Sequence, residues 1–174
     1  MKLKPQIKAR AIAREFPANA FPLKIKGNYV RDRSGHLAIT LDGVNPIEPI
    51  REIRNANMFV TVGKAWLGDL MLGIKATTLS YVGVGSGVTA PAAGDTDVET
   101  AIGARHIYTD RFRSSNIVTV STFFASGENN GTWGNAGLFT AVSAGDMMCH
   151  STFASPVTKS TANTQTIDHD ITIT

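Results

Sequence analysis

The residues of this chain that could do chemistry are few, and the glycines of residues 83–87, Gly-Val-Gly-Ser-Gly, come first. A glycine-rich turn can cradle a phosphate when a helix begins behind it and a Lys-Ser or Lys-Thr pair follows. Residues 88–91 are Val-Thr-Ala-Pro, which supply no lysine and do not begin a helix. We therefore expect no nucleotide or other cofactor here, and we interpret the glycines as the exit of a strand.

Histidine and cysteine are the next candidates, as ligands for a metal ion. The chain contains His36, His106, His150, His169 and one cysteine, Cys149. Asp168 and Asp170 flank His169, and Cys149 directly precedes His150. Neighbouring residues of a regular strand point to opposite faces, so neither group can converge on one ion. We expect no metal site.

Nucleophilic catalysis has no signature in this sequence. Ser86 lies between glycines but lacks the spacing and the following helix of a nucleophile elbow. Cys149 follows Met147 and Met148 in a predicted strand, which indicates a buried, inert thiol. The acidic residues cluster in turns, where water solvates them. We therefore expect a protein that is not an enzyme.

The bulk composition narrows the class of protein. At 174 residues the chain suits one domain, and its abundant Gly, Thr, Ser, Ala and Asn favour a β-rich domain with many turns. One cysteine allows no intrachain disulfide and no zinc site made of several cysteines. No apolar run approaches the roughly 20 residues that span a bilayer, and the N-terminus lacks the apolar core of a secretion signal. We expect no membrane contact and production in the cytoplasm.

Positive charge is concentrated at the N-terminus. Residues 1–33 carry nine Lys or Arg against two acids, whereas residues 34–174 carry eight against twelve. We interpret residues 1–22 as an extended basic arm on a body at 23–174, in which 23–54 form a less regular hairpin or attachment segment. A contact with a partner protein is the leading interpretation, and a solvated tail is the alternative. Nucleic acid is disfavoured because aromatic residues do not interleave with the charges. The candidate partner-binding residues of the arm are Lys2, Lys4, Lys8, Arg10 and Arg14.

Short strands separated by turns dominate the predicted secondary structure. The best helix candidate is residues 62–72, where Trp66 and Leu70 fall at helical spacing and Gly73 could end the helix. A short second helix could open at residues 95–99. The expected strands are residues 23–29, 37–41, 78–84, 105–112, 117–124, 138–142, 147–153 and 167–174. This pattern predicts an all-β fold, mainly an antiparallel, jelly-roll-like sandwich, with one or two short helices.

The turn at residues 127–131 supplies a second candidate contact. Asn129 and Asn130 lie within it and Trp133 follows it, so Trp133 is either a lid on the core or an interface anchor. Together with Glu128, these residues loosely match the composition of a sugar site, which wants an aromatic ring beside acids and amides. We keep all three residues, Asn129, Asn130 and Trp133, as candidate partner-binding residues.

A series of motifs follows in a characteristic order over residues 55–174. They are a glycine-bounded helix at 63–73, a strand and glycine turn at 81–87 followed by Pro91, an acidic helix start at 95–99 followed by Arg105, an Asn/Gly turn leading into Gly137-Leu138-Phe139, a Phe-to-Lys element at 153–159 and a Thr/Ile-rich terminal strand. In this order the chain resembles bacteriophage virion structural proteins of the tail, collar, fibre-base or decoration type.

The resemblance implies a non-enzymatic component of a phage particle, in the tail, neck or collar, or fibre base. Such a protein would lie in the virion, bind other virion proteins and form homo-oligomers. Capsid decoration is the alternative within this class, and a carbohydrate- or receptor-binding module is the alternative of another class. The chain departs from the pattern at Asn135-Ala136, where the related proteins often have Glu. If that Glu pairs with the arginine at the place of Arg105, the pair is missing or replaced here.

Overall fold

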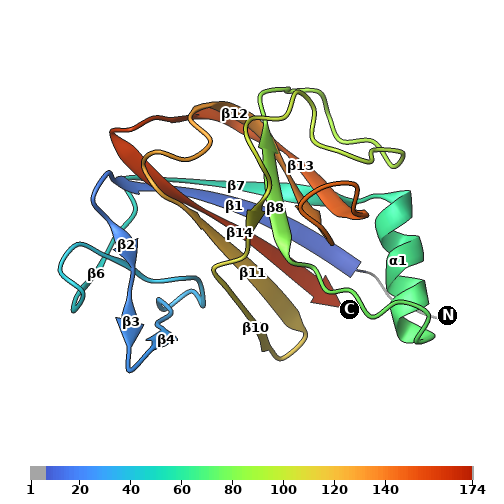
Figure 1. Cartoon of the computed structure of the whole chain (residues 1–174), viewed down its shortest axis with the longest axis horizontal. Helices are drawn as coiled ribbons and strands as arrows, with labels where there is room; N and C mark the ends of the chain where they lie inside the picture. The colour runs from blue at the N-terminus through green and yellow to red at the C-terminus, as the bar shows by residue number, and fades with distance from the viewer. Residues whose placement is uncertain (1–6, 174) are drawn as a thin grey trace, which may run out of the picture.

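The computed structural model describes residues 7–173, which form one helix and a set of antiparallel strands (Figure 1). The all-β class and its mainly antiparallel pairing are therefore confirmed. The elements are β1 (Ile7–Pro17), β2 (Phe21–Pro22), β3 (Lys24–Ile25), β4 (Asn28–Tyr29), β5 (Ile39–Thr40), β6 (Pro46–Ile47), β7 (Arg51–Phe59), α1 (Thr61–Met71), β8 (Tyr81–Gly85), β9 (His106–Ile107), β10 (Asp110–Ser114), β11 (Ile117–Phe124), β12 (Gly131–Phe139), β13 (Met147–Lys159) and β14 (Asn163–Ile173).

Nine strands form one curled sheet in the order β10-β11-β14-β1-β7-β13-β12-β8-β9. Its two edge strands are close in sequence, and the segment between them joins the edges. The Tyr108 N–H donates to the Ser80 carbonyl beside β8, and the Thr109 N–H donates to the Ser121 carbonyl of β11, each over 2.8 Å. Because hydrogen bonding connects all nine strands, the division into two stacked sheets of a sandwich is not confirmed.

The first strand corrects the expectation of an N-terminal arm. β1 lies inside the sheet, paired with β14 on one side and β7 on the other. Residues 7–17 are thus part of the body, and only residues 1–6 lie outside the described residues. The strand is hard to recognise because both of its faces are covered, so apolar and polar residues do not simply alternate. Ala11 and Ala13 face the main core, while Ile12 and Phe16 are buried on the opposite face.

A small lobe built from β2 to β6 covers that opposite face. Phe16 of β1 packs there with Ala20, Leu37 and Ile39 in a second apolar cluster. The expected hairpin of 23–29 with 37–41 is only partly correct, because β5 pairs with β2 and β6, while β3 pairs with β4. The lobe is therefore held by the sheet, which explains why strands of two residues persist here.

The main core lies inside the curl and fixes the position of α1. Its largest side chains include Trp66, Phe124, Trp133 and Phe153, from the helix and from strands on both sides of the curl. Gly63 lets the helix approach β13 closely, since a Cβ at this position would lie 2.2 Å from the Met148 carbonyl oxygen. The helix expected at 62–72 is confirmed, and one of its faces is anchored by Trp66.

Candidate functional site

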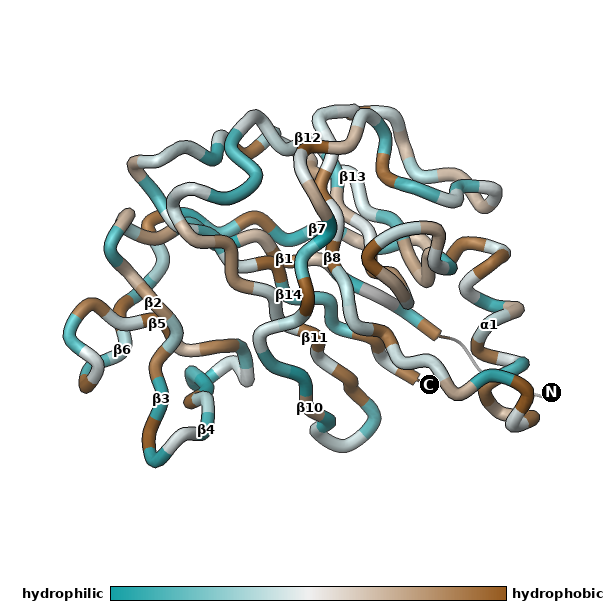
Figure 2. Tube along the Cα trace, in the orientation of Figure 1, coloured by the Kyte–Doolittle hydropathy of each residue, from teal (hydrophilic) through white to brown (hydrophobic). Residues whose placement is uncertain are grey.

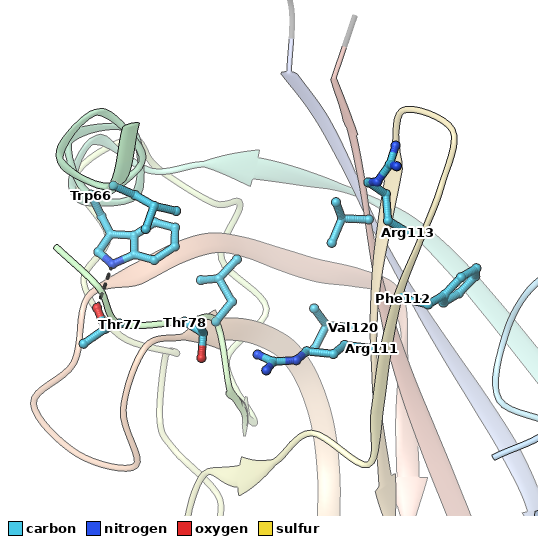
Figure 3. A pocket seen from close by; sticks show the side chains of 10 residues that line it. Trp66, Thr77, Thr78, Arg111, Phe112, Arg113 and Val120 are labelled. Atoms are coloured by element: carbon cyan, nitrogen blue, oxygen red, sulfur yellow. Dashed lines mark hydrogen bonds between the residues drawn. The ribbon is translucent and has the colours of Figure 1, made fainter. Parts of the chain in front are cut away.

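An apolar pocket of about 290 Å³ opens between α1 and the β10–β11 hairpin. One wall comes from the helix and from the segment that leads to β8, and the other comes from the hairpin (Figure 3). The lining residues are Trp66, Leu70, Thr77, Thr78, Leu79, Arg111, Phe112, Arg113, Val118 and Val120. Segments from distant parts of the sequence thus form one concave surface.

Local contacts position both walls of the pocket. The Trp66 Nε1–H donates to Thr77 Oγ1 over 3.1 Å, which ties the helix to the segment that follows it. Across the pocket, Arg111 is the register partner of Val120 on the neighbouring strand, and Arg113 is that of Val118. Side chains opposite each other on paired strands share a face, so the arginine stems lie beside the valines. Figure 3 shows the Arg111 guanidinium directed toward the opposite wall.

The C-terminal end of α1 continues this apolar surface. We call Leu70, Met71, Leu72 and Ile74 the apolar end of the helix. Met71 is 81% exposed, Leu72 76% and Ile74 68%, and Leu70 also lines the pocket. Of the whole helix, only Gly63 and Trp66 are buried. Figure 2 shows the hydrophobic residues gathered at this end of the helix and in the turn after it.

The pocket rim carries positive charge that no carboxylate neutralises within residues 7–173. Arg111 lies over the Tyr108 ring, 4.5 Å from its centroid, and Arg113 donates to the Ser115 carbonyl. Neither guanidinium forms an ion pair in this part of the chain. By contrast, the nearby Lys75 pairs with Asp146 over 2.6 Å. The surface therefore suits a ligand with an apolar body and a negative group.

The predicted basic residues do not lie at this pocket. Lys2 and Lys4 fall outside the described residues. Lys8 and Arg10 are exposed on β1, and together with Arg54 they line a groove on the outer face of the sheet. Their role as partner contacts stays a prediction.

Arg14 is buried, which contradicts its prediction as a surface contact. Its guanidinium pairs with Asp168 over 2.9 Å and with Asp32 over 2.8 Å. It also donates to the Leu37 carbonyl over 3.1 Å. Burial raises the pKa of Asp168, and the positive charge of Arg14 opposes that rise. Arg14 therefore joins the strand to the small lobe instead of reaching a partner.

The turn residues also have structural roles. Trp133 is completely buried, and its Nε1–H donates to the Asn129 carbonyl over 2.7 Å. The Asn129 side-chain amide donates to the carbonyls of Ile102 and Ala104. Asn130 is exposed but accepts a hydrogen bond from Lys159 Nζ. Trp133 is thus a core residue, and its prediction as an interface anchor is wrong.

The glycine turn is explained by close packing. A Cβ on Gly85 would lie 2.2 Å from the Glu99 carbonyl oxygen, and a Cβ on Gly134 would lie 2.1 Å from that of Gly87. β8 ends at Gly85, so the interpretation of these glycines as a strand exit is confirmed. The Asn135 amide also donates to the carbonyls of Gly87 and Glu99, which ties the turn to β12.

The described titratable residues do not assemble a metal site. Within residues 7–173, no group of three or more His, Cys, Asp or Glu side chains could hold a metal ion. His150 contacts Asp95 over 2.6 Å, and burial lowers the pKa of His169 to about 4. Burial raises the pKa of the Cys149 thiol to about 12, so it is protonated and inert at neutral pH. Arg105 pairs with Asp97 over 3.0 Å.

Sequence reasoning missed the pocket and its two rim arginines. The run of apolar residues at 70–72 was a signal for the apolar end of α1, but nothing in the sequence placed this end beside the hairpin.

Comparison with known protein families, curated proteins and solved structures finds no match for this chain. In the described part of the chain, no helix is long and apolar enough to cross a membrane.

Proposed function

We propose that this protein is a non-enzymatic structural component of a phage particle, in the tail, neck or collar, or fibre base. It binds neighbouring virion subunits, including further copies of itself. Two lines support the proposal: the ordered motifs of residues 55–174, which resemble virion proteins, and an exposed apolar surface on a rigid β body. Capsid decoration is the alternative position for the same kind of subunit.

The observation that carries the proposal is the apolar end of α1 beside the pocket. Single exposed apolar residues are ordinary on protein surfaces, but a contiguous group beside a concave apolar site marks an interaction surface. Four large apolar side chains of one helix end are exposed here instead of packed into the core. A neighbouring subunit that covered them would remove this surface from water, which favours association.

The carbohydrate-binding alternative has less support. It relied on Trp133 as the aromatic ring of a sugar site, and that side chain is completely buried. The side-chain amide of Asn129 already donates hydrogen bonds to two backbone carbonyls. The assembly function therefore remains the better proposal for this surface.

We expect Met71→Glu to prevent self-association, because it places a charge where a neighbour would bury an apolar side chain. Light scattering should give a mass that is a multiple of 18.6 kDa for the unaltered protein and 18.6 kDa for the variant. Val88→Glu is the matched control, since Val88 is exposed but lies outside the pocket and the helix end. A monomeric unaltered protein, or equal loss in both variants, would contradict the proposal.

A second experiment locates the protein in the particle. Antibodies against the purified chain should label phage particles that carry it at the tail, the neck or the fibre base in electron micrographs. Labelling spread over the capsid would favour decoration instead. Particles without any label, together with binding of the purified chain to glycans, would favour the receptor-binding module over a structural role.

A further inference from the structure

A second exposed surface has the opposite character to the pocket rim. Residues 41–50, Leu-Asp-Gly-Val-Asn-Pro-Ile-Glu-Pro-Ile, contain two acids and no Lys or Arg. Val44 is 70% exposed and Ile50 67%. Glu48 is also exposed and forms no ion pair within the described residues. We call residues 41–50 the acidic segment.

The acidic segment is held in one conformation. The Asp42 carboxylate accepts hydrogen bonds from the N–H groups of Val44 and Asn45, which closes the turn that follows β5. β6 pairs with β5, and the Ile50 N–H donates to the Glu15 carbonyl over 2.8 Å. A segment that is already ordered loses little entropy when it binds, so its exposed apolar side chains are suited to docking.

The acidic segment and the helix wall of the pocket lie at different ends of the molecule. Figure 1 shows β6 at one end of the longest axis and α1 at the other. Within one chain, the acidic segment is therefore far from the helix wall of the pocket and from the apolar end of α1. Two copies can bring the acidic segment and the pocket together if they lie one after the other along this axis, so that the β6 end of one copy faces the α1 end of the next.

We propose that the pocket of one copy receives the acidic segment of a second copy. This inference deepens the proposed function and rests on it. The apolar side chains of the acidic segment contact the pocket and the apolar end of α1, while Glu48 pairs with Arg111 and Arg113 at the rim. The charges of the two surfaces are complementary, and such complementarity fixes which surfaces meet and in which register.

The same charges disfavour a two-fold contact between two pockets. Such a contact would place Arg111 and Arg113 of both copies together in an apolar interface, where like charges repel. A contact between different surfaces of each copy is heterologous, and it produces a closed ring or an open filament, depending on whether the rotation closes. The proposed contact between copies is therefore a head-to-tail one.

Charge reversal on each side tests the contact. The loop variant is Glu48→Arg, and the pocket variant combines Arg111→Glu with Arg113→Glu. Each places like charges together, so each should weaken self-association about 100-fold and give monomers by light scattering. All three side chains are half-exposed or exposed, so the folds should persist, which circular dichroism and the urea midpoint check.

Mixing the two variants gives the decisive result. In the mixture, the intact acidic segment of the pocket variant meets the intact pocket of the loop variant, and the reversed charge at position 48 of the loop variant meets the reversed charges of the pocket variant. The mixture should therefore regain the assemblies of the unaltered protein, whereas each variant alone stays monomeric. A chain that carries all three reversals should assemble like the unaltered protein. Arg33→Glu, at an exposed position outside both the pocket lining and the acidic segment, is the control and should leave the mass unchanged.

The outcomes separate this inference from the proposed function. If the unaltered protein assembles and both variants assemble equally well, the head-to-tail contact is wrong and the proposed function stands. Monomers that do not pair on mixing would also overturn the contact. If the unaltered protein is monomeric, self-assembly itself fails. A further outcome is that another virion protein binds the unaltered chain and the loop variant but not the pocket variant. That result would show that this other protein occupies the pocket, and it would overturn the inference that a second copy does.

Discussion

Trp133→Ala is expected to lower the free energy of unfolding by about 3–5 kcal/mol, the usual range for removing a large aromatic residue from a core. Trp133 is completely buried, and its ring packs edge-on against Phe124 with 4.9 Å between centroids. The substitution leaves a cavity inside the curl and removes the donor to the Asn129 carbonyl. Urea denaturation followed by circular dichroism measures the loss.

The matched control separates a core role from a surface role. Trp133→Phe keeps an aromatic ring in the site, so it should cost clearly less than the alanine substitution. Val88→Ala, at an exposed position, should change the stability by no more than about 0.5 kcal/mol. A stable Trp133→Ala protein that had lost only a binding activity would contradict this account and revive Trp133 as a surface anchor.

Arg14→Met is expected to cost about 3–5 kcal/mol of stability, because it leaves the Asp168 carboxylate buried without its partner. Asp168 is completely buried and contacts Arg14 over 2.9 Å. Burial raises the pKa of Asp168. Protonation of this carboxylate removes the unpaired buried charge and so reduces the loss of stability in the variant. The loss should therefore be largest at neutral and higher pH, and it should shrink as the pH is lowered toward the ordinary range of a carboxyl group. Urea midpoints across this pH range measure it.

Arg10→Met is the control, four residues earlier on the same strand and exposed to solvent. It removes the same charge and should change stability only slightly. The double variant Arg14→Met with Asp168→Asn should be more stable than Arg14→Met alone, since no unpaired charge remains buried. Equal effects at positions 10 and 14 would show that the contribution of Arg14 comes from net charge and not from the buried pair.

Local patterns explain which elements the sequence could predict. The helix at 62–72 is α1 shifted by one residue, and the strand at 117–124 is β11. The strand expected at 105–112 covers β9 and the first part of β10 but misses the corner between them, at Tyr108 and Thr109. That corner exists because the two edges of the sheet come together there, and this is a long-range event without a local signal.

The central position of β1 was also beyond local reasoning. Its basic residues and the proline at its end indicated an arm, because charge on a terminal segment usually means exposure to solvent. In the structure a second layer covers β1, and Asp168 and Asp32 neutralise Arg14. Neither acid is near Arg14 in the sequence, so no spacing could reveal the pair.

Local sequence patterns were enough to predict the β-rich class, the helix and the strand exit at the glycines. These depend on side-chain periodicity and on the backbone freedom of glycine, which act over a few residues. The burial of Arg14 and Trp133, and the meeting of Arg111, Arg113 and Leu70 at one pocket, depend on long-range packing. Burial and convergence depend on which distant strands pair, and the curl of the sheet brings together residues that are far apart in the chain.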